Sequence, residues 1–429
     1  MYDLVIIGAG WAGFNAALKA KELGLKVCLI EQSNVGGTCL NKGCIPTKTL
    51  IQSAKVFALT KKLHSFGIEA GESKLIFSRV QERKDSIIDH LQKGMKFMLK
   101  GIDFINSKAE FLSSDEVSAG SQNIKSEYFL IATGSEAIEL PFMKFDSKRI
   151  ISSDEILNLK ELPDTLLIVG GGVIGCEFAS LFSTLGSKVT IVEKMMQLLP
   201  QEDKEISRRI ELSFKKKNII IHTNTDVRNL NLSEYALALV CVGRSPTFKG
   251  LKLENAGLKI ENNKITVDDY LRTSVKNIYA AGDCTGKTML AHYASYQGEI
   301  AALNIAKQDQ PKKADNKYIP NCIFTDPEIG SVGLNEETAK AAGIEISVKK
   351  FDFLASGMAR ILDETEGFIK IICNNKTDEI IGASILGPRA TELIGILTLA
   401  ASCKLRPNVF SDIVFAHPTL TESIGEILK

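Results

Sequence analysis

Residues 8–31 read GAGWAGFNAALKAKELGLKVCLIE, and residues 170–193 read GGGVIGCEFASLFSTLGSKVTIVE. The two segments align without a gap at an offset of 162 residues, and each follows an apolar strand, DLVIIG or TLLIVG. Each has the spacing G-x-G-x-x-G, a helix rich in Ala or Leu, a glycine that stops the helix, a second strand and a terminal glutamate. This repeated unit predicts an α/β fold with two Rossmann-like dinucleotide-binding domains.

The three glycines of each unit have different tasks. The first permits the tight turn from strand to helix, the second lets the backbone approach a pyrophosphate, and the third lets the helix pack on the strand. They are Gly8, Gly10 and Gly13 in the first unit and Gly170, Gly172 and Gly175 in the second. Glu31 and Glu193 each follow the third glycine by 18 residues, where a carboxylate accepts hydrogen bonds from a ribose. Two such units imply two dinucleotides.

Each half also ends in a strand that closes on a glycine. These strands are YFLIATGS at 128–135, with Thr133 and Gly134, and LALVCVGRSP at 237–246, with Gly243. A further strand runs into NIYAAGDC at 277–284, which contains Asp283. An aspartate at the end of an apolar strand suits contact with a polyol hydroxyl, but on position alone an aspartate in an ordinary turn is the simpler interpretation.

Composition restricts the class of protein. A chain of 429 residues is too long for one compact core, so we expect two or three domains. The formal net charge of +1 argues against a broad surface for nucleic acid or anionic membrane. The sequence shows no secretory signal and no run of about 18 apolar residues that would cross a membrane. We therefore expect a cytoplasmic protein.

Of the nine cysteines, seven stand singly and are expected to be buried thiols. Cys39 and Cys44 form a close pair in GGTCLNKGCIPTK, residues 36–48. Five residues along a regular helix separate two Cα atoms by about 8.6 Å, whereas a disulfide needs about 4.4–6.8 Å. A bridge therefore requires a distorted turn, which Gly43 can supply, and we expect Pro46 to push Ile45 out of the helical region.

The competing uses of the two cysteines are a metal site and a pair of unrelated buried thiols. Two thiolates without a second cluster of Cys or His leave zinc short of its four ligands. We therefore predict no metal site. A regular helix is expected over residues 48–63.

Together these motifs resemble the pyridine nucleotide–disulfide oxidoreductase family over essentially the whole chain, most closely its lipoamide-linked branch. The resemblance rests on GAGWAG, GGTCLNKGCIPTK, IATGS, GGGVIG with Glu193, AAGDC, MLAH and HPTLTE. It implies that a nicotinamide domain is inserted into a flavin domain and that an α+β interface domain follows and dimerises. The expected boundaries are 1–147 and 268–316 for the FAD domain, 148–267 for the NAD domain and 317–429 for the interface domain.

The resemblance also implies which residues hold the cofactors. FAD would be held by Gly8, Gly10, Gly13, Glu31 and Asp283, and NAD by Gly170, Gly172, Gly175 and Glu193. Further cofactor contacts are expected at Gly37, Thr38, Thr133, Gly134 and Gly243. Cys44 would lie against the flavin and Cys39 would exchange with the substrate. Lys48 would lie near the flavin, paired with Glu177.

His417, in AHPTLTESIGEIL, is the candidate base. The reducing substrate arrives as a dithiol, so exchange needs a group that takes up a proton. Glu422 could orient the imidazole as the acid does in a catalytic triad. A lone histidine is more often structural, but the match to the family's C-terminal motif favours catalysis. In the family this histidine comes from the partner subunit, so we expect a homodimer.

We therefore expect an enzyme that oxidises a dihydrolipoyl group, free or on a carrier domain, with NAD and FAD. The chain ends in GEILK without a further cysteine pair, and Glu193 would repel the 2′-phosphate of NADP. One alternative is an NAD(P)H-dependent reductase of another small disulfide, similar to glutathione reductase. Another is a flavin-bearing redox sensor or scaffold that does not turn over.

Two further regions bear on the domain organisation: the C-terminal part of the chain and the segment between Glu193 and Gly243. Residues 289–307 read as a helix, 308–320 as a polar linker, 376–378 as the turn of an antiparallel hairpin and 391–405 as a helix. Only 49 residues separate Glu193 from Gly243. That leaves room for at most a truncated β-meander, so strand edges there are expected to be exposed or paired differently, which would affect NAD affinity.

Overall fold

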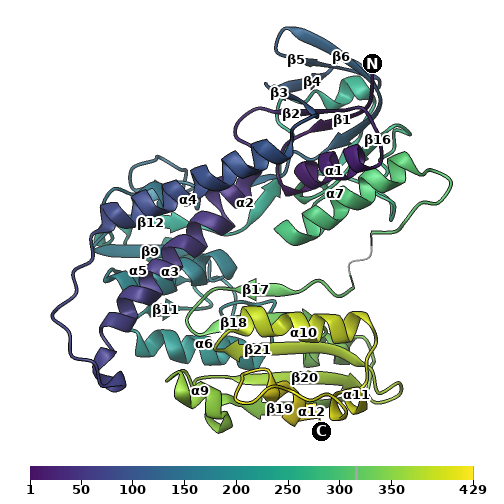
Figure 1. Ribbon diagram of the computed structural model, residues 1–429. Helices are drawn as coiled ribbons and strands as arrows, with labels where there is room; N and C mark the ends of the chain where they lie inside the picture. Colours follow the sequence, from purple (N-terminus) through teal and green to yellow (C-terminus); the bar gives the residue numbers. More distant parts are fainter. Residues whose placement is uncertain (315–316, 429) are drawn as a thin grey trace.

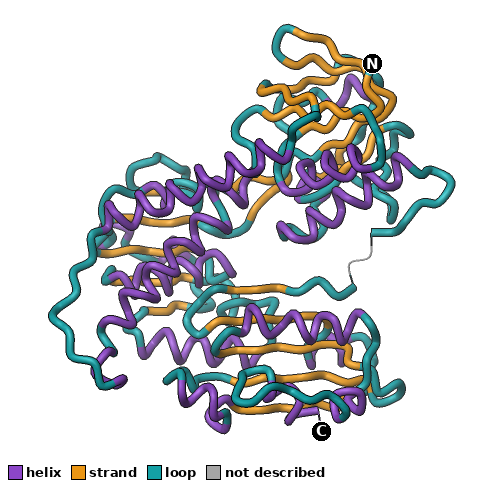
Figure 2. Tube along the Cα trace, in the orientation of Figure 1, coloured by secondary structure: helices purple, strands orange, loops and turns teal. Residues whose placement is uncertain are grey.

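The computed structural model describes residues 1–314 and 317–428, and it contains three units, each built on one main sheet (Figure 1). The strands of the three sheets lie apart from one another with helices between and around them (Figure 2). The observed architecture confirms the predicted α/β class with a C-terminal α+β unit. The expected boundary between residues 316 and 317 touches residue 316, which lies outside the described residues.

The first sheet holds the first strand–helix–strand unit. Its order is β3-β2-β1-β6-β5-β4, and β16 pairs with β6. β1 is parallel to both β2 and β6, while β4, β5 and β6 are antiparallel. The strands are β1 (Tyr2–Ile7), β2 (Val27–Glu31), β3 (Asp103–Asn106), β4 (Ala109–Phe111), β5 (Glu116–Ala119), β6 (Gln122–Ile131) and β16 (Ile278–Ala280). The carboxyl ends of β1, β6 and β16 therefore meet at one edge, where ligands bind in such sheets.

Two helices lie side by side against this sheet, α1 (Trp11–Glu22) and α7 (Ala291–Ala306) (Figure 1). They approach closely because Gly298 of α7 has no side chain. A Cβ added there would lie 2.0 Å from the backbone oxygen of Ala12. The helix predicted over 289–307 is confirmed by α7. The region between β2 and β3 forms α2 (Gly37–Lys42), α3 (Cys44–Thr60) and the long α4 (Phe77–Met98).

The second sheet holds the second unit and consists of parallel pairs in the order β11-β10-β9-β12-β8. Its strands are β8 (Ile150–Ile151), β9 (Thr165–Val169), β10 (Lys188–Val192), β11 (Ile220–His222) and β12 (Leu237–Val240), and its helices are α5 (Val173–Leu185) and α6 (Lys204–Lys216). In the described chain between β11 and β12 the only regular elements are two short 3-10 turns. The possible truncated meander is thus absent there, and Ile220 on the edge strand β11 is 56% exposed.

Two short antiparallel strands connect the first two units, β7 (Ser135–Ala137) and β13 (Arg244–Pro246). After β13 the chain forms the hairpin β14 (Ile260–Glu261) and β15 (Lys264–Ile265). Leu253 and Ile265 pack into the same core as Val5 of β1. The expected boundary at 267/268 is therefore too late, because apolar residues well before it are already buried in the first unit. We propose 148–243 as the inserted unit.

The C-terminal unit is an antiparallel sheet of order β17-β18-β21-β20-β19. Its strands are β17 (Asn321–Ile323), β18 (Glu328–Gly333), β19 (Ile346–Asp352), β20 (Phe368–Asn374) and β21 (Ile380–Gly387). Its helices are α8 (Glu336–Ala341), α9 (Gly357–Ile361), α10 (Ala390–Ser402), α11 (Pro407–Ser411) and α12 (Glu422–Leu428). The pair β20–β21 confirms the predicted hairpin and α10 the predicted apolar helix. Buried Lys370 of β20 is 3.0 Å from Asp203 at the start of α6, which ties this sheet to the second unit.

The single cysteines follow the prediction with two exceptions. Five are buried, at positions 28, 176, 241, 284 and 373, whereas Cys322 is half-buried and Cys403 is exposed. Cys403 departs from the prediction because it lies just beyond the C-terminal end of α10.

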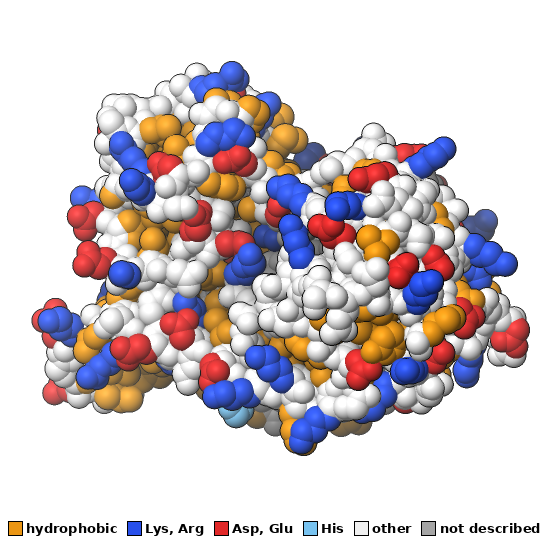
Figure 3. Space-filling model, turned by 90° about the horizontal axis from the view of Figure 1, so that it is seen from above, with side chains coloured by type: hydrophobic (Ala, Val, Ile, Leu, Met, Phe, Trp, Pro, Cys, Tyr) orange, Lys and Arg blue, Asp and Glu red, His pale blue; other side chains and the backbone are white. Residues whose placement is uncertain are grey.

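The face of the molecule seen from above carries no single dominant charge. Basic and acidic side chains are interspersed over the face drawn in Figure 3. Among the described residues, no helix is both long enough and apolar enough to cross a membrane.

Candidate functional site

The cysteine pair lies where two helices are joined by a broken turn. α2 ends at Lys42 and α3 begins at Cys44, and Gly43 between them has φ −146° and ψ −113°, which interrupts the helix. This confirms the expected distortion at Gly43. The expectation for Pro46 is wrong: Ile45 is helical, and Pro46 lies in the first turn of α3, where its missing N–H costs no intrahelical hydrogen bond. The helix predicted over 48–63 thus begins four residues earlier.

Cys39 and Cys44 are both half-buried, and their side chains interact through a hydrogen bond. That hydrogen bond is the main reason why the pKa of Cys44 is lowered to about 7; the charge of Lys48 lowers it further, against the effect of burial. The pKa of Cys39 is raised, first by its hydrogen bond to Cys44 and then by burial. Cys44 is therefore the sulfur that carries negative charge at neutral pH, and a thiolate is the reactive form.

Lys48 lies one turn after Cys44 and joins three units of the molecule. Its Nζ is 2.8 Å from both carboxylate oxygens of Glu177, a buried residue of α5. The backbone N–H of Phe324, which follows β17, donates to the same carboxylate at 2.9 Å. The Nζ also lies 4.8 Å from the centre of the Phe324 ring. The predicted pairing of Lys48 with Glu177 is thus present.

The two glycine turns have the same backbone construction. A Cβ on Gly13 would lie 1.8 Å from the carbonyl oxygen of Gly8, and a Cβ on Gly175 would lie 1.9 Å from that of Gly170. Any side chain at these positions would push the helix off its strand. The third glycine of each motif is therefore required for helix packing, as predicted.

The glutamates that end the two units are held by equivalent hydrogen bonds. Glu31 accepts from the backbone N–H of Ala9 at 2.7 Å and of Ser33 at 2.8 Å. Glu193 accepts from the backbone N–H of Gly171 at 2.6 Å and of Met195 at 2.6 Å. Each carboxylate is thus fixed beside its glycine turn, and its remaining lone pairs can accept from ribose hydroxyls.

The remaining predicted cofactor residues lie at the same edges of the two sheets. Thr133 and Gly134 follow β6, Asp283 follows β16 and accepts from the Ser135 hydroxyl at 2.5 Å, and Gly243 follows β12. Gly37 and Thr38 form the start of α2.

Two observations test whether dinucleotides fit these edges. The nearest atom to a Cβ added at Gly10 would be the Cα of Gly37 at 3.8 Å, and at Gly172 nothing would lie within 4 Å, so space remains at both helix N-termini. At the first edge, Thr133 Oγ1 and Gln297 Nε2 are buried without a hydrogen-bond partner in the described structure. Buried polar atoms are normally paired, so these two indicate a polar ligand.

His417 and Glu422 form the predicted pair. The imidazole Nδ1 lies 2.8 Å from the Glu422 carboxylate, and the histidine side chain is 80% exposed. This contact is the main reason why the pKa of Glu422 is lowered. The geometry orients the ring and leaves its Nε2 edge facing outward.

Within one chain, His417 and the cysteine pair lie far apart. Lys48 contacts Phe324 beside β17, whereas α12 packs against β19, and these strands are the opposite edges of the C-terminal sheet. Four spacings of about 4.8 Å place the two edges about 19 Å apart. Figure 1 likewise shows α2 and α12 in different parts of the molecule.

The comparisons with known proteins agree with this geometry. The family model for "Pyridine nucleotide-disulphide oxidoreductase" matches residues 2–298, and the model for its dimerisation domain matches residues 319–428. The chain belongs to the pyridine nucleotide–disulphide oxidoreductase family. Family members use FAD and NAD, so the predicted family, fold and cofactors are confirmed.

Similar members of this family cover almost the whole chain. A dihydrolipoyl dehydrogenase from Bacillus subtilis is 38% identical over 99% of this chain and 97% of that protein. One from Chlamydia trachomatis is 39% identical over 99% and 96%. Among solved structures, the HOCl-induced flavoprotein disulfide reductase RclA from Escherichia coli has a TM-score of 0.89 at 32% identity, covering 100% of this chain and 99% of that one. LpdA from Mycobacterium tuberculosis has a TM-score of 0.92 at 27% identity, covering 99% and 98%.

One residue that sequence reasoning missed connects the two dinucleotide units of this family fold. Arg244, in β13, donates from Nε to the Ser135 hydroxyl at 2.9 Å, and the same hydroxyl binds Asp283. Its guanidinium also lies 3.8 Å from Asp154, at the entry to the second unit. The available signal was an arginine directly after Gly243, at a predicted strand end where the chain crosses between domains.

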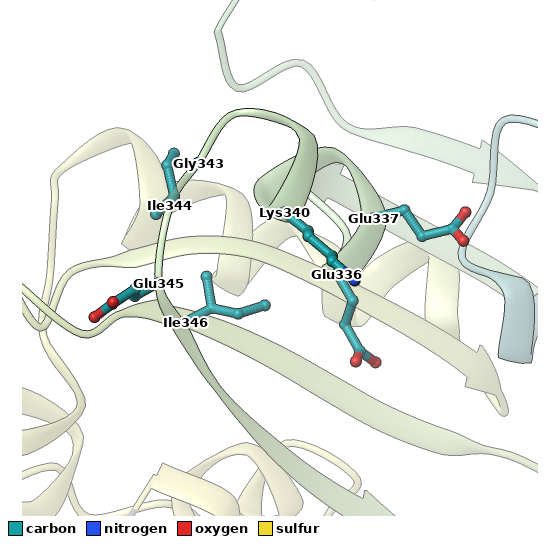
Figure 4. Close-up of a pocket in the computed structure, with 7 residues that line it drawn as sticks. All are labelled: Glu336, Glu337, Lys340, Gly343, Ile344, Glu345 and Ile346. Atoms are coloured by element: carbon teal, nitrogen blue, oxygen red, sulfur yellow. The ribbon is translucent and has the colours of Figure 1, made fainter.

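A pocket of about 600 Å³ lies away from this site, between α8 and the start of β19 (Figure 4). The carboxylates of Glu337 and Glu345 point away from each other in Figure 4, so they do not converge on a common point. Glu336 pairs with Lys370 at 2.7 Å, and Glu337 pairs with Lys204. Because its acids are paired or divergent, we assign this pocket no part in the redox chemistry of the family.

Proposed function

We propose that this oxidoreductase oxidises dihydrolipoyl groups with NAD. The dithiol loses two electrons and two protons as its disulfide forms; NAD⁺ takes up a hydride, and one proton is released. The observation that carries this choice of substrate is the likeness, over 99% of the chain, to proteins named dihydrolipoyl dehydrogenase at 38–39% identity.

The cysteine pair is the proposed entry point for these electrons. A substrate thiolate attacks Cys39, and the electron pair of the broken Cys39–Cys44 bond remains on Cys44, the sulfur whose pKa is lowered to about 7. A lower leaving-group pKa speeds such exchange. Lys48, fixed by buried Glu177 at 2.8 Å, stabilises that negative charge. FAD, when bound at the first glycine turn, supplies the carrier that links the dithiol pair to NAD.

Glu193 is the proposed determinant of nicotinamide choice. Its carboxylate is fixed by two backbone N–H groups, so it cannot swing away from a ribose bound at the second glycine turn. A 2′-phosphate at that place would meet a like charge. This supports NAD over NADP.

His417 is the proposed base, and it acts on the active site of a partner subunit. The histidine is exposed and oriented by Glu422, and it lies at the opposite sheet edge from Lys48 in its own chain. A second copy joined through the dimerisation domain matched at 319–428 would bring the two together. We therefore propose a homodimer with two composite sites.

A second candidate is reduction of another small disulfide by NADH. The specific support for it is RclA, a flavoprotein disulfide reductase that shares 32% identity and a TM-score of 0.89 with this chain.

Parallel assays separate the two candidates. The purified holoenzyme is supplied either with dihydrolipoamide and NAD or with NADH and one of lipoamide, glutathione disulfide or cystine. A kcat/KM for the lipoyl substrate at least about 100-fold above that of any other disulfide supports the proposal. A higher value for another disulfide would replace it with the reductase. Bound flavin that NADH cannot reduce would indicate a sensor or scaffold.

A further inference from the structure

Trp11 is the single tryptophan of the chain and occupies the first position of α1, directly after the second glycine of the flavin-side turn. The equivalent position of the second turn is Val173. The two units therefore differ at the first helical residue, and the first turn also has the cysteine helix α2 beside it.

The backbone around Trp11 packs directly against the cysteine segment. The N–H of Gly36 donates to the Ala9 carbonyl oxygen at 2.8 Å. A Cβ on Gly37 would lie 2.6 Å from the Cα of Gly10, so the backbones of these two segments touch with no side chain between them. Trp11 is one residue beyond Gly10 and Cys39 is two residues beyond Gly37. The Trp11 indole and the Cys39 thiol extend from these two contacting segments and interact with each other.

The indole N–H is the polar atom at this contact. Trp11 Nε1 is buried and has no hydrogen-bond partner of good geometry in the described structure. It still lies near enough to Cys39 to lower the pKa of that thiol, although the hydrogen bond to Cys44 and burial raise it more strongly. While Cys39 is a neutral thiol that donates to Cys44, the attraction between the indole N–H and its sulfur is weak. A negative charge on Cys39 would strengthen it.

We propose that Trp11 is a positioning residue of the redox pair, whose indole N–H donates a hydrogen bond to the Cys39 sulfur whenever Cys39 carries the negative charge.

This role rests on the exchange proposed above and refines its second half. After the first attack, a mixed disulfide joins Cys39 to the substrate. The second substrate sulfur then attacks the first, so that a bond forms between the two substrate sulfurs and the bond to Cys39 breaks. The electron pair stays on Cys39, which leaves as a thiolate. A donor aimed at that sulfur stabilises the leaving group and so speeds release of the oxidised product.

The test measures Cys39 alone, without substrate or NAD. In the Cys44→Ser holoenzyme, the rate at which iodoacetamide alkylates Cys39 is followed against pH by mass spectrometry of the peptide that contains it. This readout keeps the exposed Cys403 from contributing. Adding Trp11→Phe, which keeps an aromatic ring but removes the N–H, should raise the pH midpoint by about one unit and slow alkylation about tenfold below it. Adding Trp11→His instead, which retains a ring N–H, should recover part of that shift.

An unchanged midpoint in Trp11→Phe would overturn the proposal, and so would equal shifts in Trp11→Phe and Trp11→His, which would indicate ring size rather than the donor. If the Trp11 variants fail to fold, the emission of Trp11 in Cys44→Ser provides the answer. It should titrate with the alkylation midpoint, and the titration should disappear when Cys39→Ser is added. Emission that does not titrate would contradict the proposal. Neither measurement depends on lipoamide, so a failure here is distinguishable from a failure of the proposed substrate.

Discussion

The two glycine turns of this chain are built alike but closed differently. Both fix a glutamate through two backbone N–H groups, and both pack a glycine against a carbonyl oxygen. In front of the first, Gly37 of α2 lies within contact distance of Gly10. In front of the second, a Cβ at Gly172 would meet nothing within 4 Å, and Met196 nearby is 83% exposed. One turn is enclosed and the other is open.

This difference suits the exchange behaviour of the two cofactors. In the proposed reaction a flavin that takes electrons from the cysteine pair has to stay beside it, so a site closed by the cysteine helix is appropriate. A nicotinamide has to leave after each turnover, and an open turn allows that. The lesson is that the repeated motif determines what kind of group binds, while the neighbouring elements determine whether that group can leave.

The largest expected effect comes from Cys39→Ser, which changes the cysteine helix at the enclosed first turn and leaves the open second turn intact. Cys39→Ser removes the sulfur that the substrate thiolate attacks, so turnover with dihydrolipoamide should fall by at least about 10³-fold, because no mixed disulfide can form. Reduction of the flavin by NADH should remain, since hydride transfer from NADH to the flavin does not involve Cys39. Dithionite titration provides the check: the native protein should take up two more electrons than the variant, as its disulfide does. Equal uptake would mean that no redox-active disulfide exists.

The next effect tests whether His417 acts as the base in dithiol chemistry. His417→Ala should reduce dithiol-driven turnover by about 10²–10⁴-fold, the usual cost of losing a general base. Glu422→Gln should fall between this variant and the native enzyme, because the ring remains but loses the negative charge of its partner, which lowers its basicity. Flavin reduction by NADH, measured by stopped flow, serves as the control. An equal loss in that step would make the histidine structural.

Mixing two inactive variants sharpens the same point. In a mixed dimer of His417→Ala and Cys39→Ser chains, one of the two composite sites has both native residues. Exchange of subunits should therefore restore part of the turnover with dihydrolipoamide. If subunits exchange, as shown by differently tagged chains, and no activity returns, each chain must use its own histidine.

Matched substitutions at the two glutamates test the comparison most directly. Glu193→Ala should weaken NAD binding about 10- to 100-fold, the usual value of hydrogen bonds to a charged group, while the protein retains its flavin. Glu31→Ala should do the reverse, releasing flavin during purification with little effect on nicotinamide binding. Fluorescence titration with NADH and flavin absorbance measure the two. Should both variants lose the same cofactor, the two turns would not be independent sites.

The smallest effect concerns pH at the cysteine pair. In the reduced native enzyme, thiolate absorbance should titrate with a midpoint near the pKa of about 7 of Cys44. Lys48→Gln removes a nearby positive charge that favours the thiolate, so the midpoint should rise by about one unit or more. Lys62→Gln is the matched control, because Lys62 is an exposed lysine just beyond the C-terminal end of α3. It should leave the midpoint unchanged. A midpoint that falls in Lys48→Gln would contradict this account of the site.

Much of the candidate site followed from local sequence. The glycine spacing and the distance to Glu31 and Glu193 depend on one strand, one turn and one helix each, so short-range rules were sufficient. The break at Gly43 was equally local. The error at Pro46 arose because the rule for the residue before proline is a tendency, and here the first turn of α3 accommodates both residues.

Only the tertiary structure decided the rest. It brought Lys48, Glu177 and Phe324 from three separate units to one point, showed that residues 251–265 return to the first core, and left no meander in the described chain between β11 and β12. It also placed His417 and Lys48 at opposite edges of one sheet. The sequence by itself determined the kinds of cofactor that bind and predicted the two reactive sulfurs, because these depend on residue types at short spacing. Which distant side chains meet depends on how buried faces pack, and no short-range pattern carries that information.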